Sequence, residues 1–263
     1  MNLQFIEARD LGDAWFQTLY RILEQGTVFK IDRGSYEGQK RLEFDWVTIQ
    51  IRNPGVRPLL PQIESHYNIP NPVSDDYLDS YVPYLMTGEL KPGESYTYGQ
   101  RMTNILVSNI WSTTYNSKEY KDILIQDKEV WEKIHNNDEI LNQIELLIWT
   151  YKNKGHRNNQ MILQVGQPTD ILLQDPPCLR HIDTRIQDGK LHFYPYFRSW
   201  DLWGGFPANL AGIQIMKEYI ASEIGVEDGE IIASSKGLHL YDYSFDLAKV
   251  LRMKEDMELK EGK

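Results

Sequence analysis

The sequence is poor in cysteine: Cys178 is the single one among 263 residues. No intramolecular disulfide can form, which fits a reducing compartment. The sequence also lacks an apolar run long enough to cross a bilayer as a helix. Its N-terminal stretch contains acids and no continuous apolar segment, so we expect no signal peptide. These absences favour a cytoplasmic protein without a membrane partner.

Positive charge is scarce as well, because 28 lysines and arginines face 38 acidic residues and leave a net charge of −10. Such a chain is a poor nonspecific ligand for nucleic acid, so we expect no nucleic-acid partner. A phosphorylated ligand would need cations concentrated at one place. The sequence shows no repeats, and its 41% apolar content supports one domain across residues 1–263.

Hydrophobic spacing and turn residues predict a mixture of helices and strands. Helices are expected over residues 11–25, 74–87, 138–152 and 209–225, the last with Asn209 as its simplest N-cap. One alternating strand is expected over 40–54, a short one over 161–165, and a hairpin around Asp188-Gly189. Proline-rich residues 53–73 are expected to form an extended loop. Strands packed against long helices indicate an α/β or α+β fold.

Cys178 follows two prolines, and a lone cysteine is more often a small buried side chain than a nucleophile. Further along, the segment FRSWDLWGGFPANLAG brings Arg198, Ser199, Asp201 and Asn209 together before a helix. A glycine turn followed by an N-cap explains part of this segment. It does not explain an Arg-Ser-x-Asp pattern beside two tryptophans.

Three motifs in this order resemble the active-site half of thymidylate synthase. They are PPC at 176–178, RSxDxxxGxPxN at 198–209 and GxHxY at 237–241. Weaker similarity is carried by IDRG (with Asp32 and Arg33), by YGQR at 98–101 and by residues 142–163. The resemblance spans roughly residues 20–250 and is specific over 176–241. It implies the thymidylate synthase fold, a large twisted mixed sheet flanked by helices, and a homodimer.

The resemblance also implies a reaction. The Cys178 thiolate would add to C6 of a pyrimidine nucleoside monophosphate and make C5 nucleophilic toward a one-carbon donor. That donor would be 5,10-methylenetetrahydrofolate or a related tetrahydropterin, with no metal. The preferred activity is conversion of dUMP to dTMP. The alternatives are a 5-hydroxymethylase acting on dUMP, UMP, CMP or dCMP, and a non-catalytic nucleotide-binding homologue.

The resemblance assigns roles to individual residues on the phosphate and the base. Arg198 would bind the 5′-phosphate and lower the pKa of Cys178, with Arg33 and Ser199 as further phosphate ligands. Asn209 would hold O4 and N3–H of uracil, because an amide offers both a donor and an acceptor. Cytosine-acting relatives tend to carry Asp at this position. The alternative for Arg33 is a solvated or ion-paired side chain.

The remaining roles concern the sugar, the pterin and the protons. His239 and Tyr241 would bind the ribose hydroxyl, Asp201 would orient the pterin and a water, and Tyr98 is a candidate proton relay at C5. Alternatively, His239 and Tyr241 are core residues, and Tyr98 only stacks. The family's general-base glutamate has no secure counterpart; Asp79 is the first candidate, with Asp76 and Glu89 as rivals.

Several positions depart from the family pattern. Leu179 and Phe197 stand where the family has His and Gln, so the water network around the base must differ. Asn159 and Gln160 align with paired arginines that reach the partner subunit's phosphate, which leaves Arg157 as the nearest cation. The charged residues 252–263 replace a longer, apolar family C-terminus and are expected to be frayed. Weaker exclusion of water from the site would favour the hydroxymethylase reaction, because water would then compete with hydride for the transferred one-carbon unit.

Overall fold

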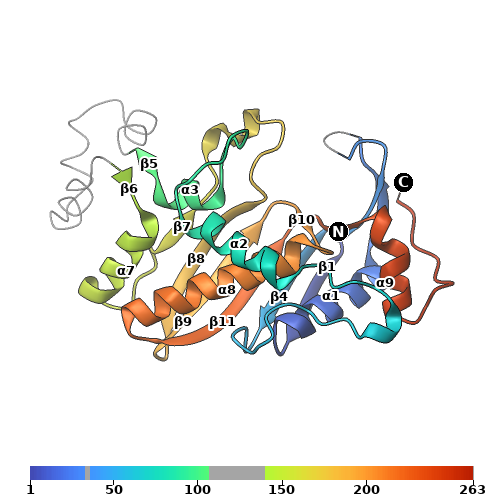
Figure 1. Ribbon diagram of the computed structural model, residues 1–263, viewed down its shortest axis with the longest axis horizontal. Coiled ribbons are helices and arrows are strands. Elements are labelled where there is room, and N and C mark those ends of the chain that lie inside the picture. The colour runs from blue at the N-terminus through green and yellow to red at the C-terminus, as the bar shows by residue number, and fades with distance from the viewer. Residues whose placement is uncertain (33–35, 107–139, 263) are drawn as a thin grey trace.

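The centre of the computed structural model, which describes residues 1–32, 36–106 and 140–262, is a six-stranded sheet (Figure 1). Its strands in spatial order are β1 (Leu3–Ala8), β4 (Trp46–Ile51), β11 (Glu227–Ser235), β9 (Lys190–Phe197), β8 (Leu179–Gln187) and β7 (Ile162–Gln164). β1 pairs with β4 and β11 pairs with β9 in parallel, whereas the other neighbours are antiparallel. The large mixed sheet confirms the predicted fold class.

A second sheet lies beside the first and supplies part of the site described below. It contains β10 (Trp200–Asp201), β12 (Leu238–Tyr241), β3 (Lys40–Glu43) and β2 (Thr27–Lys30), and a two-stranded ribbon pairs β5 (Ile105–Leu106) with β6 (Ile140–Leu141). The prediction of one continuous strand over 40–54 was wrong, because the structure has two strands there, β3 and β4. Strand pairing is interrupted at Phe44, which is buried and whose backbone N–H donates to the Leu238 carbonyl at 3.0 Å. β3 and β4 therefore belong to different sheets.

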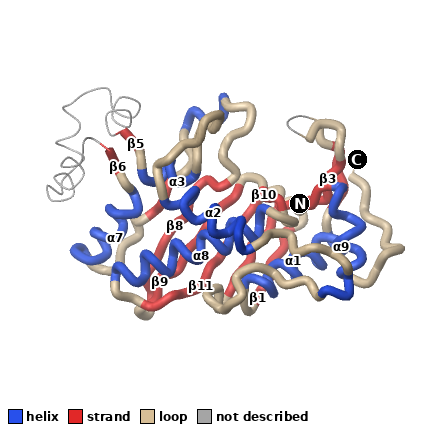
Figure 2. The backbone as a smooth tube through the Cα atoms, viewed as in Figure 1, coloured by secondary structure: helices blue, strands red, loops and turns tan. Residues whose placement is uncertain are grey.

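Helices lie on one face of the large sheet, as Figure 2 shows, with α1 (Leu11–Gln25) and α8 (Gly205–Ile224) packed directly on its strands. α3 (Tyr98–Thr103) and α7 (Gln143–Lys154) contact β7, α2 (Asp75–Met86) packs on α8, and α9 (Phe245–Leu251) packs on α1. The short turns are η1 (Ser65–Tyr67), η2 (Pro168–Leu172) and η3 (Asp242–Ser244). The predictions over 11–25 and 74–87 are confirmed, and Asp10 and Ser74 cap these two helices. No described helix is long and apolar enough to traverse a bilayer.

The alternation along β9 shows where the core lies. Leu191, Phe193 and Phe197 are fully buried beneath α8, whereas His192 and Tyr194 on the opposite face are only partly buried. The same alternation continues across β4 and β11. The predicted hairpin is confirmed, since Asp188 and Gly189 adopt positive φ angles of 52° and 73° between β8 and β9.

The C-terminal segment differs from its prediction. Residues 252–263 were expected to be frayed, but Lys260 and Gly262 hydrogen bond through their backbones to Val28 of β2, both at 2.8 Å. An ion pair between Lys40 and Glu261 at 3.1 Å lies beside them. Backbone pairing to an edge strand therefore overcomes the tendency of this charged sequence to remain unstructured.

Candidate active site

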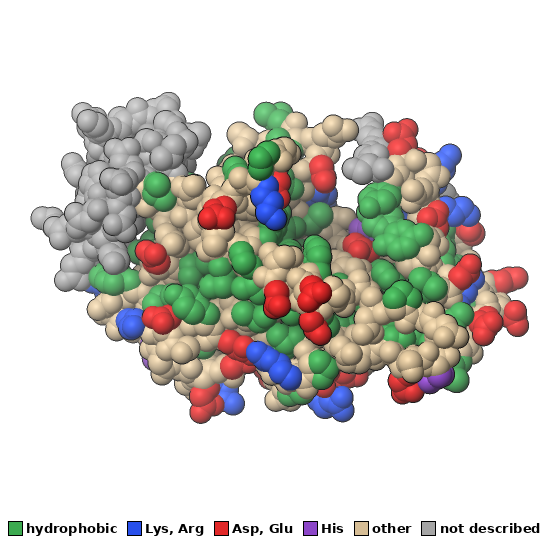
Figure 3. Space-filling view, viewed as in Figure 1, with side chains coloured by type: hydrophobic (Ala, Val, Ile, Leu, Met, Phe, Trp, Pro, Cys, Tyr) green, Lys and Arg blue, Asp and Glu red, His purple; other side chains and the backbone are tan. Residues whose placement is uncertain are grey.

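Cys178 lies immediately before β8, where three distant segments of the chain meet. The backbone N–H of Arg198, just after β9, donates to the Cys178 carbonyl at 2.9 Å. The backbone N–H of Leu179 donates to the Tyr98 hydroxyl at 3.4 Å, which brings the first residue of α3 to the cysteine. The structure thus places Cys178, Arg198 and Tyr98 together. The surface is hollowed between the lobe of α3 and the lobe of β2 and β3 (Figure 3).

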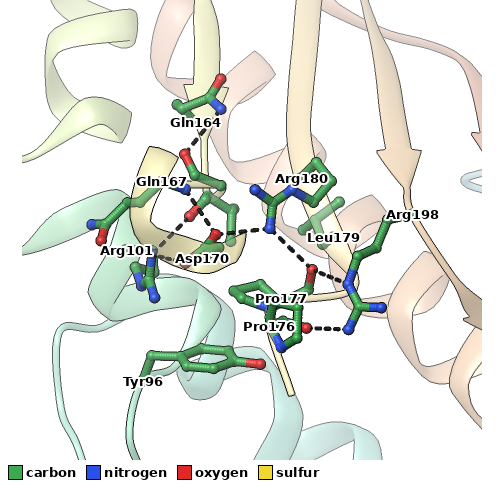
Figure 4. A network of polar contacts seen from close by, with 12 residues as sticks. Tyr96, Arg101, Gln164, Gln167, Asp170, Pro176, Pro177, Leu179, Arg180 and Arg198 are labelled. Carbon is green, nitrogen blue, oxygen red and sulfur yellow. Dashed lines mark hydrogen bonds and ion pairs between the residues drawn. The ribbon is translucent and has the colours of Figure 1, made fainter. Parts of the chain in front are cut away.

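The guanidinium of Arg198 is anchored to the two prolines that precede the cysteine (Figure 4). Its Nε donates to the Pro177 carbonyl at 3.2 Å, and a terminal nitrogen donates to the Pro176 carbonyl. The same terminal nitrogen pairs with Asp175 at 3.4 Å. Carbonyl groups that bear no formal charge hold most of this guanidinium, so its positive charge remains available to an anionic ligand.

The net effect of this environment on Cys178 differs from the sequence-based expectation. Burial raises the pKa of the Cys178 thiol, and the Arg198 charge acts in the opposite direction without overcoming it. Asp175 and Asp201 raise this pKa further. Arg198 therefore favours the thiolate, but the pKa of the free thiol is raised overall, because desolvation and two carboxylates outweigh the charges of Arg198 and Arg180.

An ion-pair network supports the loop that carries the cysteine (Figure 4). The buried carboxylate of Asp170 contacts Arg101 at 3.0 Å and Arg180 at 2.7 Å, and accepts from the Gln167 backbone at 2.8 Å. Burial acts to raise the pKa of Asp170, but this hydrogen bond and the two arginines hold it below its usual value. Arg180 also reaches the Pro177 carbonyl at 3.4 Å. The network therefore fixes the proline pair.

Asp201 organises the start of α8. Its carboxylate accepts backbone N–H bonds from Trp203 at 3.2 Å, Gly204 at 3.1 Å and Gly205 at 2.9 Å. The helix begins at Gly205, so the prediction that Asn209 is its N-cap was wrong. The carboxylate of Asp201 stabilises the free N–H groups there, which leaves Asn209 inside the helix with its side chain available.

Asn209 is held from two sides. Its Oδ1 accepts from the indole Nε1 of Trp200 at 3.0 Å, and its Nδ2 donates to the Tyr81 hydroxyl at 2.5 Å. Tyr81 lies on the buried face of α2 and stacks on Tyr84 at 5.5 Å, which in turn packs edge-on against Tyr98 at 5.6 Å. A line of phenol rings thus connects Asn209 to the residue that contacts the cysteine segment.

The phenols near the cysteine are held in their neutral form. Burial raises the pKa of Tyr84 and of Tyr96 to about 12, and the nearby Cys178 adds to both shifts. Burial also raises the pKa of Tyr98. These hydroxyls are therefore proton donors near neutral pH, rather than phenolates.

His239 and Tyr241 lie on β12, next to β10. The Nδ1–H of His239 donates to the Gly237 carbonyl at 2.9 Å, because a carbonyl can only accept, and burial lowers the pKa of this imidazole. Its Nε2 is buried and has no hydrogen-bond partner among the described residues. The ring packs edge-on against Tyr241 at 4.6 Å. His239 is therefore buried, as the core interpretation predicts. It also has an unpaired acceptor, Nε2, which a ribose-binding residue would need.

Two cavities of about 360 Å³ each lie beside these residues, one at Arg198 and Ser199 and the other at Asp201 and Asn209. The first is polar and is lined by Met1, Arg41, Glu43, Asp45, Arg198, Ser199, Lys236 and Gly237. The second lies between the start of α8 and α2 and is lined by Pro72, Val73, Ser74, Tyr77, Asp201, Gly204, Gly205, Ala208 and Asn209. The sequence did not predict Arg41 and Lys236 here, because only strand pairing brings them to Arg198. Arg41 arrives through the pairing of β3 with β12 and of β12 with β10, and Lys236 through the pairing of β11 with β9.

Arg33 lies outside the described residues, and two other predicted residues, Asp79 and Arg157, lie apart from the site. Asp79 is exposed on α2, as are its rival Asp76 and the rival Glu89 in the loop after this helix. Arg157 is exposed in the loop between α7 and β7. The residue that α2 does direct at Asn209 is Tyr81, which the sequence did not predict, because its spacing also fits an ordinary core position.

Comparison with known proteins identifies the family. A family model described as thymidylate synthase matches residues 96–260. A Methanosarcina acetivorans protein described as a candidate thymidylate synthase is 30% identical over 246 residues, 94% of this chain and 93% of that protein. The chain belongs to the thymidylate synthase family.

More distant members of the thymidylate synthase family show the same relationship. A protein of Methanothermobacter thermautotrophicus, also described as a candidate thymidylate synthase, is 23% identical over 258 residues, 93% of this chain and 96% of that protein. A thymidylate synthase of Listeria monocytogenes is 28% identical over 182 residues, 67% of this chain and 56% of that protein. The family is one of one-carbon transferases that use methylenetetrahydrofolate.

Proposed function

We propose that this protein methylates C5 of dUMP, with Cys178 as the nucleophile and methylenetetrahydrofolate or a related tetrahydropterin as the donor. The observation that carries the proposal is the junction of Cys178, Arg198 and Tyr98. In a member of this family, that junction places a thiol, a cation and a phenol around one point, where a pyrimidine ring could meet all three.

The phosphate would occupy the polar cavity. Arg198, Ser199, Arg41 and Lys236 line it, so three cations gather there on a chain whose net charge is −10. Arg41 is paired with Glu43 at 2.7 Å, and burial raises the pKa of that carboxyl. A phosphate dianion would compete with Glu43 for Arg41, since both are anionic ligands for the same guanidinium. Arg33 remains a prediction for this subsite.

The base and sugar would lie between the phosphate and α8. Asn209 retains one N–H for O4 of uracil and one lone pair for N3–H, beyond the bonds it already makes. The unsatisfied Nε2 of His239 would accept from a ribose hydroxyl, which removes the cost of an unpaired buried acceptor. Tyr241, beside it, would be the second sugar contact.

The pterin would fit the second cavity. Tyr77 offers an aromatic surface there, and Asp201 offers carboxylate lone pairs beyond its three backbone bonds. When bound, the donor supplies the one-carbon unit that C5 receives. This position brings the pterin next to Asn209, and therefore next to the base.

The protein's own groups would act as follows. The Sγ thiolate of Cys178 adds to C6, and the electron pair of the C5–C6 bond moves toward C5 and O4. Arg198 stabilises the thiolate, and phosphate binding at the same guanidinium positions the ring over the sulfur. After C5 has formed its new bond, loss of the C5 proton permits the sulfur to leave. Tyr98 is our candidate for relaying that proton, while Asp79 is retained as a candidate base only.

A hydroxymethylase is the second candidate, because two side chains that could control water are apolar here. Leu179 and Phe197 are fully buried, and Phe197 stacks on Trp200 at 4.1 Å, so neither can hold a water by a side-chain hydrogen bond. The two activities share every step up to transfer of the one-carbon unit. They differ in whether the transferred unit ends as a methyl or as a hydroxymethyl group.

We also infer a homodimer through the uncovered face of the large sheet. Leu3 and Phe5 of β1 are 68% and 58% exposed, and Trp46 stacks on Tyr196 of the same face at 5.7 Å. These side chains form an apolar part of a face that no described element covers, and burying it against another layer would gain free energy. Sedimentation equilibrium measures the stoichiometry. A monomer at micromolar concentration would contradict the inference.

Release of tritium from [5-³H]dUMP tests the function. Release that requires a reduced pterin and is lost in Cys178→Ala, with nucleotide binding retained by calorimetry, supports it. A product heavier by about 14 Da indicates methyl, and one heavier by about 30 Da indicates hydroxymethyl, as the added CH₂ or CH₂O requires. Absence of release from dUMP, UMP, dCMP and CMP alike would identify a non-catalytic homologue.

A further inference from the structure

The amide of Asn209 is held in one orientation by a partner that can only donate. Its Oδ1 faces the indole Nε1 of Trp200 at 3.0 Å. An indole N–H has no lone pair to offer, so an amide turned by 180° would place two donors against each other. Tyr81 on the other side cannot impose this choice, because a hydroxyl accepts from Nδ2 as readily as it donates to Oδ1.

Trp200 has little freedom to follow the amide. It is 1% exposed and lies between two aromatic rings, with Phe197 stacked at 4.1 Å and Phe206 at 4.5 Å. Its backbone is fixed in β10, which pairs with β12. The indole N–H therefore has a fixed position, and Asn209 adapts to it.

The orientation of the amide decides which pyrimidine it can match. Uracil presents an acceptor at O4 beside a donor at N3, whereas cytosine presents a donor at N4 beside an acceptor at N3. If the base lies as in the proposed function, the fixed amide would present its remaining N–H to O4 and its remaining lone pair to N3–H, which suits uracil. A freely turning amide would match either base, because rotation by 180° exchanges the donor and the acceptor.

We propose that Trp200 is the residue that determines base specificity, by locking Asn209 in the orientation that binds uracil and excludes cytosine. This inference rests on the proposed function, in which Asn209 contacts the base. Trp200 is a positioning residue, since it acts through Asn209 and does not touch the substrate.

The test is the ratio of dissociation constants for dUMP and dCMP, measured by calorimetry on the full chain. Trp200→Phe keeps the stacked ring and removes the N–H. We expect the preference for dUMP to fall about tenfold, since one hydrogen bond no longer fixes the amide. Trp203→Phe, in the same segment, is the control and keeps the wild-type ratio. An unchanged ratio in Trp200→Phe, with dUMP still bound, overturns the proposal.

Introducing Trp200→Phe into the Asn209→Asp variant distinguishes a loss of base specificity from a general structural effect of the substitution. In Asn209→Asp the carboxylate has two equivalent oxygens, so there is no orientation for Trp200 to lock. Trp200→Phe should therefore alter the dUMP to dCMP ratio when it is introduced into the wild-type protein. The same change introduced into the Asn209→Asp variant should leave that variant's ratio unchanged. An equal shift in both backgrounds would show a merely structural effect and would overturn the lock.

A measurement on the folded protein covers the case in which Trp200→Phe does not fold. The indole N–H resonance of Trp200, identified by sequential resonance assignment among the seven tryptophans, should move downfield in Asn209→Asp, because a carboxylate is a stronger acceptor than an amide. No movement overturns the contact. Failure of the proposed function is distinct: wild-type protein would then bind neither nucleotide, or would prefer dCMP.

Discussion

The hydroxyl of Tyr98 accepts the backbone N–H of Leu179 at 3.4 Å, so the first residue of α3 is tied to the residue that follows the nucleophile. This bond uses a lone pair of the phenol oxygen and leaves its proton free to donate. Because burial raises the pKa of Tyr98, the phenol keeps that proton across the neutral range. The contact therefore both positions the Cys178 segment and places a proton donor beside it.

Replacing Tyr98 by Phe should separate these two effects. We expect tritium release from [5-³H]dUMP to fall by about 100-fold or more, as is typical when a proton-transfer group is lost. Nucleotide affinity should change little, because the phosphate ligands are untouched. Tyr20→Phe is a matched control, since its hydroxyl contacts Leu251 at 3.2 Å, far along the chain from the cysteine. Undiminished release in Tyr98→Phe would assign the ring a stacking role alone.

Asp175 should control the reactivity of the nucleophile. It raises the pKa of Cys178 through its charge, and it also pairs with Arg198, the cation that opposes the shift. Asp175→Asn should therefore lower the thiol pKa and move the pH profile of iodoacetamide alkylation to lower pH. Asp183→Asn, which alters an exposed carboxylate on β8, should leave the profile in place. A profile that moves to higher pH would contradict the assignment.

Asp170 should be a major contributor to stability. Asp170→Asn leaves two arginines short of their shared carboxylate, and loss of one partner from a buried ion pair costs about 3–5 kcal/mol. Urea unfolding measures this free energy, with Asp188→Asn in the hairpin as a control that keeps its turn conformation. Because the folded pKa of Asp170 is lowered, its contribution is present above the unfolded pKa and lost as pH falls through the folded pKa. The difference in unfolding free energy between Asp170→Asn and wild type should therefore become smaller at acidic pH.

Lys217 should give a pH dependence of the same sign as that of Asp170, but at alkaline pH. It is fully buried on α8, where its ammonium contacts the Gly229 carbonyl and lies 3.2 Å from Asp228. Burial lowers the pKa of Lys217 to about 8, so the charged form is disfavoured by folding. Between about pH 8 and the unfolded pKa of about 10.4 the unfolded chain binds more protons, and stability due to Lys217 rises with pH.

Lys217→Met removes this titration while keeping a side chain of similar length. The unfolding free energy of wild type relative to the variant should increase by about 3 kcal/mol between about pH 7 and about pH 10.5, as the shift of the pKa requires. Denaturant unfolding at a series of pH values gives both free energies, and other alkaline titrations cancel in the difference. A difference that is flat with pH would show that Lys217 titrates normally.

Local patterns predicted the parts of the fold that depend on neighbours in sequence. The helices at 11–25 and 74–87, the hairpin at Asp188-Gly189 and the cluster around Cys178 and Arg198 carry their own caps, turn residues or motif spacing. The break at Phe44 could not be predicted, because an alternating pattern continues through it and only pairing with Leu238 interrupts the strand.

The same limit applies to the site. Asn209 was selected from its motif, but Trp200 and Tyr81 acquire a role only because β10 and α2 bring their polar atoms to the amide. Arg41 and Lys236 are separated by most of the chain and meet at one cavity through the second sheet. Residue type and spacing thus indicated the chemistry, whereas the groups that orient it depend on contacts between distant segments.

The pairing of residues 260–262 with Val28 has a consequence for solubility. β2 is the last strand of its sheet, and an unpaired edge offers its N–H and C=O groups to any other extended chain. The backbone of Lys260 and Gly262 pairs with the N–H and C=O groups of Val28 on this edge, and the ion pair of Lys40 and Glu261 lies beside it. The charged C-terminal segment thus shields this edge against aggregation by strand addition.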